Sequence, residues 1–221
     1  MLKGVIFDID GTLVDSNDAH ANAWVDTFAE GGYQVAFDVV RTMIGMGGDK
    51  LMPACIGIEE DSKEGKKLSE RRGELFKTDY LPRLKPLAGS RALLQRIRKD
   101  GLKTVVATSA SDEDLKGLLK AAKVLDLMQD AATSSDAENS KPDPGIVVAA
   151  IRKIGLPRES LVMIGDTPYD IEAAQRAGVR IIAFRSGGWT DSELSGSAAI
   201  YDGPADLENR YESSILAKRR D

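Results

Sequence analysis

The chain has 221 residues, of which 42% are hydrophobic, so it can bury the core of one ordinary domain or of a domain with a large insertion. Its formal net charge of −5 at pH 7 leaves no broad basic field, which argues against a general nucleic-acid or membrane-surface binder. It shows no signal-peptide pattern, no run near the roughly 18 apolar residues of a membrane helix, and a single cysteine, Cys55. We therefore expect a soluble cytoplasmic protein without an intrachain disulfide.

The first predicted element is an apolar strand in "GVIFDIDGTLVDS" (residues 4–16), which ends in Asp8 and Asp10. If the extended geometry persists to Asp10, the two carboxylates point to the same side and repel each other. Two unit charges about 4 Å apart repel by roughly 4 kcal/mol at an effective dielectric near 20. A bound cation is the simplest way to offset that repulsion.

The next segment, residues 17–81, contains mainly helical patterns and no convincing strand–helix–strand unit. Two examples are "DAHANAWVDTFAEGG" and "EEDSKEGKKLSERRGELFKTDYL". We expect this segment to form a helical cap inserted into a core made of residues 1–16 and 82–221. The stretch "LPRLKPLAG" (residues 81–89), with Pro82 and Pro86, is typical of a linker that returns to the core.

The remaining chain alternates strands with helices. Apolar, β-branched stretches predict strands in residues 103–109, 160–166 and 179–184, with a weaker strand in 130–135 and an edge strand in 198–203. Amphipathic patterns that end near a glycine predict helices in residues 89–101 and 143–155, and a further helix is expected in 111–125. This order predicts an α/β fold with a Rossmann-like parallel sheet core and the inserted α-helical cap.

Polar residues follow the predicted strands where each strand ends. Thr108 and Ser109 follow the second strand, and Asp166 follows a later one, with Asp170 in the first turn of the next helix. Lys141 precedes Pro142, which places it in a loop. Taken singly, Ser109 could be an N-cap and Lys141 a solvated charge.

Taken together, however, these residues suit a particular ligand pair. In an open parallel sheet, ligands bind beyond the carboxyl ends of the strands. Four carboxylates, a hydroxyl and a lysine gathered there would suit a divalent cation with oxygen ligands and a phosphate dianion. Mg²⁺ is the metal that we expect.

The motifs "DIDGT", "ATS", "SKPDP" and "GDTPYD" resemble the four signature motifs of the haloacid dehalogenase-like hydrolase superfamily, in matching order and spacing. The resemblance covers residues 5 to about 188, and the helical insertion resembles the small cap of that family. It implies that Asp8 attacks phosphorus to form an aspartyl-phosphate, while Asp10 protonates the leaving oxygen and later deprotonates water. It also implies that Ser109 and Lys141 hold the phosphoryl oxygens.

The same resemblance assigns the metal site. Asp8, the backbone carbonyl of Asp10 and Asp166 would bind Mg²⁺, and Asp170 would support the site. Gly11 would permit the tight exit from the strand.

Further substrate contacts are expected around the same site. Thr12 would support the phosphoryl-binding loop, and Ala110, next to Ser109, is included among the substrate-binding residues.

The cap segment "RTMIGMGGDK" (residues 41–50) is rich in glycine. Its glycines would let the loop approach a ligand, with Gly47 among the substrate-binding residues and Arg41 and Lys50 gripping a second anionic group. The alternative is a flexible cap turn flanked by solvated charges.

The single histidine, His20, lies in "DSNDAHANAW" (residues 15–24), which resembles β-phosphoglucomutases, where the corresponding histidine lies near the acid/base aspartate. Similar sequences occur in sugar-phosphate phosphatases, so His20 has either a catalytic or a structural role. Thr12 favours the phosphatases, since the mutases often have valine there.

We therefore expect a monomeric or weakly dimeric Mg²⁺-dependent phosphatase acting on a small phosphorylated metabolite, of the sugar phosphate or phosphoglycolate type. The alternatives are a β-phosphoglucomutase-like sugar phosphomutase and a non-catalytic phosphate-binding regulatory protein. The intact set of polar residues at the strand ends argues against the last.

Overall fold

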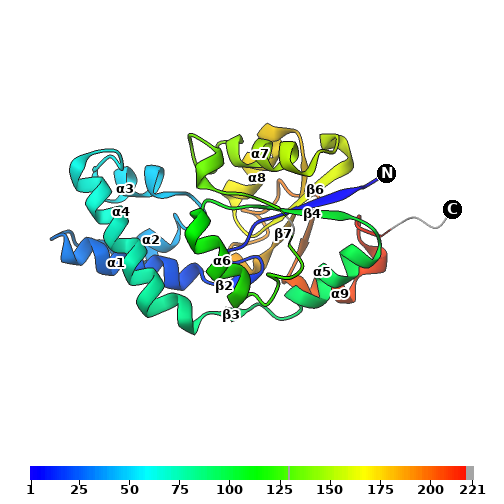
Figure 1. The fold of residues 1–221 in the computed structure, drawn as a ribbon, viewed down its shortest axis with the longest axis horizontal. Coiled ribbons are helices and arrows are strands. Elements are labelled where there is room, and N and C mark those ends of the chain that lie inside the picture. Colours follow the sequence, from blue (N-terminus) through cyan, green and yellow to red (C-terminus); the bar gives the residue numbers. More distant parts are fainter. Residues whose placement is uncertain (129, 218–221) are drawn as a thin grey trace.

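The computed structural model describes residues 1–128 and 130–217. Its centre is a parallel sheet with the strand order β5-β4-β1-β6-β7-β8. In Figure 1 this sheet and its helices form one end of an elongated molecule, and the cap helices form the other end. The predicted α/β fold, a Rossmann-like parallel sheet with an inserted helical cap, is therefore confirmed.

The strands lie where the apolar stretches predicted them, including the weak strand and the edge strand. They are β1 Gly4–Phe7, β4 Lys103–Ala107, β5 Ala131–Ala132, β6 Leu161–Gly165, β7 Arg180–Phe184 and β8 Ala199–Tyr201. Strand β1 is central and pairs with both β4 and β6, so Phe7 lies level with Val106 on one side and Ile164 on the other. This register brings the residues that follow the three strands to one edge of the sheet.

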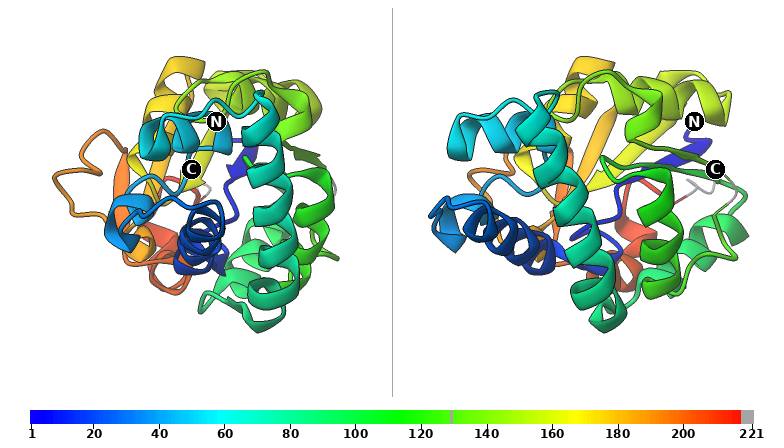
Figure 2. Two further views of the ribbon diagram at one scale, coloured as in Figure 1. Left: turned by 90° about the vertical axis from the view of Figure 1, so that its left-hand side faces the viewer. Right: turned by 60° about the vertical axis from the view of Figure 1, so that its left-hand side comes forward.

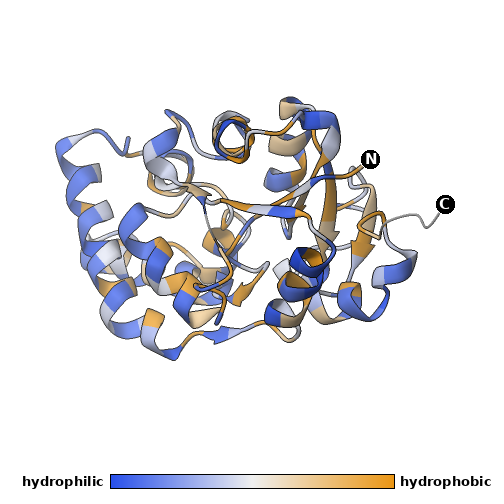
Figure 3. Cartoon of the chain, turned by 45° about the vertical axis from the view of Figure 1, so that its right-hand side comes forward, coloured by the Kyte–Doolittle hydropathy of each residue, from blue (hydrophilic) through white to orange (hydrophobic). Residues whose placement is uncertain are grey.

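Two layers of helices bury the sheet. Helices α7 and α8 cover one face, while α5 and α9 pack together over the other. Figure 3 shows the strands in the apolar colour and much of the helix surface in the polar colour, as expected for strands covered on both faces. The bounds are α5 Ser90–Lys99, α6 Asp112–Ala121, α7 Gly145–Ile154, α8 Pro168–Ala177 and α9 Pro204–Asn209. Short 3₁₀ turns lie at Ser134–Asp136, Arg158–Ser160, Arg185–Gly187 and Tyr211–Ser213.

The segment between β1 and α5 is helical, apart from two short strands that connect it to the core. Its helices are α1 Asn17–Glu30, α2 Phe37–Arg41, α3 Gly48–Ile56 and α4 Lys63–Leu75, followed by a π-helix at Phe76–Tyr80 and a 3₁₀ turn at Leu81–Arg83. The outgoing strand β2 (Val14–Asp15) pairs antiparallel with the returning strand β3 (Lys85–Pro86). Viewed from the cap, Figure 2 shows α1 and α4 in front of the sheet. Within the described residues, no helix is long and apolar enough to cross a membrane.

The junction of α5 and α9 depends on a glycine, which gives a stability prediction. Gly89 precedes α5 with a φ of 83°, and a Cβ there would lie 2.5 Å from the Cα of Ala205 in α9. We expect Gly89→Ala to lower the free energy of unfolding by about 1–3 kcal/mol, because it adds a left-handed alanine and a backbone clash. The matched control is Gly73→Ala in α4, where nothing lies within 4 Å of the added Cβ. It should raise stability by about 0.5–1 kcal/mol. Urea unfolding measures both, and equal effects would contradict the prediction.

Candidate active site

The residues that follow β1, β4 and the loop before α7 meet in a small cavity of about 90 Å³ under the cap. The core contributes Asp8, Asp10, Ser109, Ala110 and Lys141 to its lining. The cap contributes a further set: His20, Trp24, Ile44, Gly45, Met46, Gly47, Gly48 and Arg72. The structure thus brings together most of the predicted site residues, at the sheet edge where ligands of parallel α/β folds bind.

Lys141 lies between two carboxylates at the base of this cavity. Its Nζ contacts Asp8 and is 2.7 Å from Oδ1 of Asp170. The side chain is almost fully buried, so the alternative of a solvated surface charge is wrong. Burial disfavours the charged form, but the charges of Asp170 and Asp8 raise the pKa of Lys141 above its usual value. The lysine therefore stays cationic next to Asp8.

The carboxylates around this lysine carry more negative charge than it can balance. Burial, together with the charges of Asp170, Asp166 and Asp10, raises the pKa of Asp8 well above its usual value, although Lys141 opposes this shift. Burial and the charge of Asp170 raise the pKa of Asp166 to about 7. Ligand oxygens of Asp8, Asp166 and Asp170 lie within 4.8 Å of one another. This buried set of hard oxygen donors, short of positive charge, fits a divalent cation such as Mg²⁺.

Asp170 is held by the start of its own helix. Thr167 caps α8 and donates from its hydroxyl to Oδ2 of Asp170 at 2.7 Å, while the amide of Asp170 donates back to the Thr167 hydroxyl. Since its other oxygen, Oδ1, accepts from Lys141, both carboxylate oxygens are engaged. Asp170 is therefore fixed in place beside Lys141, as the expected supporting role requires.

Asp166 is held by the segment that leaves β1. Thr12 donates to its Oδ1 at 3.0 Å and Asn17 to its Oδ2 at 2.8 Å. Gly11, with a φ of 69°, passes so close that a Cβ would lie 2.1 Å from Oδ2 of Asp166. Thr12 and Gly11 therefore contact the predicted metal ligand and do not line the cavity. Sequence reasoning missed Asn17, which lies shortly after the first motif and begins the first cap helix.

Asp10 points away from this group of carboxylates and toward the cap. Its Oδ1 accepts hydrogen bonds from Ser16 at 2.5 Å and from Nε2 of His20 at 2.7 Å. Burial raises the pKa of Asp10, but contacts with His20 and Ser16 and the charge of Arg72 lower it overall. Its carboxylate is thus not part of the metal group, so the backbone carbonyl is the donor that we expect from Asp10.

His20 is held between Asp10 and Arg72 of α4. A guanidinium of Arg72 contacts Nδ1 of His20. Because a guanidinium can only donate, Nδ1 accepts and Nε2 carries the hydrogen that His20 donates to Asp10. The imidazole also stacks on Phe76, with 4.1 Å between the ring centroids. This chain of contacts links the cap to Asp10.

Arg72 is the main functional candidate that sequence reasoning missed. It lines the small cavity, and its guanidinium lies 5.5 Å from the centroid of the Trp24 ring. In "SERRGEL" two arginines are adjacent. Arg71 forms surface ion pairs with Glu30 and Glu74, whereas Arg72 faces the site. The local pattern of charge did not distinguish them.

Ser109 presents a hydroxyl without a partner among the described residues. The N-cap of α6 is Ser111, whose hydroxyl accepts from the amide of Asp114, so the interpretation of Ser109 as a cap is wrong. The backbone amide of Ala110 donates to Thr108 at 3.1 Å. Ala110 therefore lines the cavity, but its amide is already hydrogen-bonded. The hydroxyl of Ser109 can donate a hydrogen bond to a ligand.

The structure does not bring Arg41 or Lys50 into the small cavity. Arg41 donates to Asp18 at 2.7 Å and to the carbonyl of Gly187 at 2.8 Å. Lys50 forms an ion pair with Asp143. The sequence placed both residues close to the glycines of the cap loop but gave no sign of these partners on the core.

The cap loop itself docks on the core segment that carries Lys141. The amide of Gly47 donates to the Ser140 hydroxyl at 2.9 Å, and the amide of Ser140 donates to Asp49 at 3.1 Å. A Cβ on Gly47 would lie 2.7 Å from the Cβ of Ser140. Gly47 therefore lets the cap loop pack closely against the core, in addition to lining the cavity.

Residues 5–184 match the family of haloacid dehalogenase-like hydrolases. The protein SUPPRESSOR OF QUENCHING 1, chloroplastic, from Arabidopsis thaliana is 34% identical over 192 residues, which are 84% of this chain but 18% of that protein. A phosphoglycolate phosphatase from Rhodospirillum rubrum is 29% identical over 218 residues, covering 94% of this chain and 90% of that protein. The crystal structure of a hydrolase from Pseudomonas syringae has a TM-score of 0.88 and 30% identity, covering 96% of this chain and 98% of that one.

The docking contacts predict how Lys50 behaves when it is replaced. If Lys50 fixes the cap through Asp143, then Lys50→Ala and Asp143→Ala should raise KM by similar factors, and the double variant should be no worse than either single variant. If Lys50 grips substrate instead, Lys50→Ala should be damaging and Asp143→Ala nearly silent. Steady-state kinetics of the three variants distinguish the two roles.

Proposed function

The chain belongs to the haloacid dehalogenase-like hydrolase family and is a phosphatase of that family; we propose that it is Mg²⁺-dependent and hydrolyses a small phosphorylated metabolite through an aspartyl-phosphate on Asp8. The observation that carries the proposal is the buried contact of Lys141 with Asp8, with the unpartnered hydroxyl of Ser109 on the same cavity. A nucleophile, a cation and a hydrogen-bond donor thus surround a space that suits a phosphoryl group.

In the first step, a carboxylate oxygen of Asp8 forms a bond to phosphorus while the bond to the leaving oxygen breaks. Lys141 and Ser109 hold the equatorial oxygens, where negative charge is concentrated in the transition state. In the second step, water attacks the aspartyl-phosphate and restores the Asp8 carboxylate. Both steps use the same clamps, because the phosphoryl group stays in place.

Asp10 is the acid in the first step and the base in the second. In the free protein its lowered pKa keeps it ionised. An incoming phosphate dianion raises the pKa of a neighbouring carboxylate, because like charges disfavour the ionised form. Substrate binding thereby favours the protonated Asp10 that the leaving oxygen needs. His20 and Ser16 engage Oδ1, and among the described residues no hydrogen bond is made to Oδ2, which is therefore the proton-transferring oxygen.

Asp8, the backbone carbonyl of Asp10 and Asp166 would hold the Mg²⁺, with Asp170, Thr12 and Asn17 keeping these ligands in position. A bound Mg²⁺ neutralises carboxylate charge and polarises a phosphoryl oxygen. The raised pKa values of Asp8 and Asp166 support this assignment, since without added positive charge the nucleophile is disfavoured in its ionised form.

The proposal is tested by phosphate release from a panel of phosphorylated metabolites. Asp8→Asn should lower kcat at least about a thousandfold while the fold is kept, because it removes the nucleophile at nearly constant volume. Excess chelator should abolish wild-type activity, and added Mg²⁺ should restore it. Asp126→Asn, on an exposed ion pair with Arg91, is the matched control and should keep full activity. Retained hydrolysis in Asp8→Asn, or in chelator, would refute the mechanism.

A sugar phosphomutase is the second candidate, and the hydrogen bond between His20 and Asp10 favours it. A mutase must grip the distal phosphate of a bisphosphate while it excludes water from the aspartyl-phosphate. Arg41 and Lys50, the expected grips, are engaged in docking the cap. The site therefore supports hydrolysis better than phosphoryl transfer to a second hydroxyl.

A single incubation decides between the two candidates. We expect β-glucose 1-phosphate with a trace of glucose 1,6-bisphosphate to yield inorganic phosphate and little glucose 6-phosphate, because Arg41 and Lys50, the expected grips for a distal phosphate, are engaged on the core. Both products can be measured in one time course. Faster formation of glucose 6-phosphate than of phosphate would establish the mutase instead.

A further inference from the structure

A second, larger cavity of about 680 Å³ lies between cap and core and joins the small one. The two cavities share lining residues from both parts of the molecule, namely Trp24, Gly47, Gly48, Arg72, Ser109 and Ala110. A phosphoryl group held at Asp8 would therefore direct its leaving group into the larger space. This volume is within the range of sites that bind drug-sized ligands, and a two-carbon leaving group would fill little of it.

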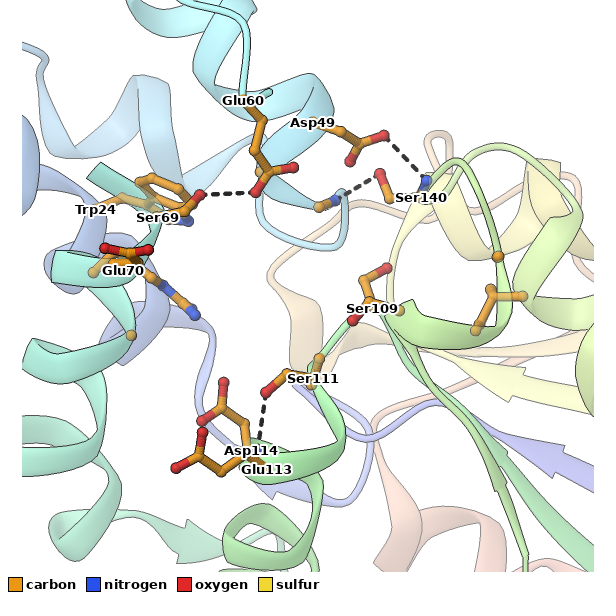
Figure 4. Close-up of a pocket in the computed structure, with 18 of the residues that line it drawn as sticks. Trp24, Asp49, Glu60, Ser69, Glu70, Ser109, Ser111, Glu113, Asp114 and Ser140 are labelled. Carbon is orange, nitrogen blue, oxygen red and sulfur yellow. Dashed lines mark hydrogen bonds between the residues drawn. The ribbon is translucent and has the colours of Figure 1, made fainter. Parts of the chain in front are cut away.

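The larger cavity is acidic. Of the described residues that line it, seven are acidic and two, Arg72 and Lys77, are basic. Figure 4 shows Glu113 and Asp114 projecting from α6 on one side and Glu60 on the opposite side. A second negative charge on the leaving group would enter a space with an excess of negative charge.

The two cations are already committed. Nζ of Lys77 is 2.6 Å from Glu113 and 3.8 Å from Oδ1 of Asp114. The guanidinium of Arg72 contacts His20 and lies near the charges of Asp114, Asp10 and Glu60. Lys77 is therefore paired within the wall, and the Arg72 guanidinium is held by His20, with its Nε left unpartnered among the described residues.

Unpartnered acceptors and donors on the cavity wall point to the kind of ligand that fills it. Oδ1 of Asp114 has no hydrogen-bond partner among the described residues, although Asp114 is only 6% exposed. The hydroxyl of Ser109 and Nε of Arg72 are likewise unpartnered there. A buried carboxylate oxygen without a donor is costly, so a ligand that donates a hydrogen bond to Asp114 would remove that cost.

We propose that the substrate is a phosphomonoester whose leaving group is a polyhydroxylated, non-anionic molecule, such as a sugar or an amino sugar. Hydroxyl or amine groups donate to Asp114 and to the other carboxylates of the wall, while a carboxylate or second phosphate is repelled. The inference rests on the proposed phosphatase function and selects its sugar phosphate form over its phosphoglycolate form.

Three phosphate esters of six-carbon compounds test the proposal. Glucose 6-phosphate has a neutral leaving group, glucosamine 6-phosphate adds an amine, and 6-phosphogluconate adds a carboxylate. We expect kcat/KM for the first two to exceed that for the third at least about tenfold, a difference of about 1.4 kcal/mol. Raising the ionic strength should narrow the gap, since salt screens charge. Equal or better hydrolysis of 6-phosphogluconate, or phosphoglycolate as the best substrate of a panel, would overturn the proposal.

Substitutions of acidic residues on the cavity wall test whether this wall causes the preference for non-anionic leaving groups. Asp114→Asn removes a charge at constant size, and Glu60→Gln does so on the cap side should the first variant fail to fold. Each should raise the ratio of kcat/KM for 6-phosphogluconate to that for glucose 6-phosphate about threefold or more. The matched control, Glu159→Gln, changes the net charge equally at an exposed position outside the cavity and should leave the ratio unchanged. A ratio that is the same in all variants would refute the assignment.

Binding separates this inference from the proposed function. Calorimetry with Asp8→Asn protein and Mg²⁺ gives the affinities for the three esters without turnover. Tighter binding of glucosamine 6-phosphate than of 6-phosphogluconate supports the inference even if no ester is hydrolysed by the wild-type protein. The reverse order refutes it even if phosphate release depends on Asp8 as proposed.

Discussion

The contact of one buried lysine with two buried carboxylates is the interaction on which the site depends. Moving Lys141, Asp8 and Asp170 out of water costs several kcal/mol for each ion, and only close mutual contact offsets that cost. Asp8 and Asp170 converge because β1 and β6 are neighbours in the sheet, and Lys141 contacts both from the loop before α7. Charge balance is nevertheless incomplete, since Asp166 is a third buried carboxylate in the same place. The fold thus holds a site that is more stable with a cation than without one.

The cap is coupled to that lysine through the backbone. Ser140, next to Lys141 in the chain, accepts from the amide of Gly47 and donates to Asp49, both in the cap. Arg72 and His20 make the corresponding connection to Asp10. Lys141, the proposed phosphate clamp, and Asp10, the proposed acid/base residue, are therefore both oriented by contacts that exist only when the cap lies against the core.

The parts of the molecule that could be predicted from the sequence are those set by local patterns. Runs of β-branched residues placed the strands, and the polar residue at each strand end placed Asp8, Ser109 and Asp166 at one edge. The partners of charged residues on the cap could not be predicted, because each depends on which side of a helix faces the core. Arg71 and Arg72 are adjacent, yet one is on the surface and the other holds His20. Lys50 was expected to contact a ligand but pairs with Asp143, a partner that is distant in the chain.

The leaving group cannot be inferred from the motifs, because the side chains that would surround it also depend on how helices face one another. The motifs supply the groups that contact phosphorus, whereas the wall of the larger cavity is built by Glu60 and Glu70 of the cap and by Asp114 of the core. These residues lie outside the four motifs, so likeness in the motifs does not extend to the wall. A phosphatase with the same catalytic groups and a basic wall would favour carboxylated substrates. In this chain the cations on the wall are already paired or engaged, so the charge of the cavity selects against an anionic leaving group.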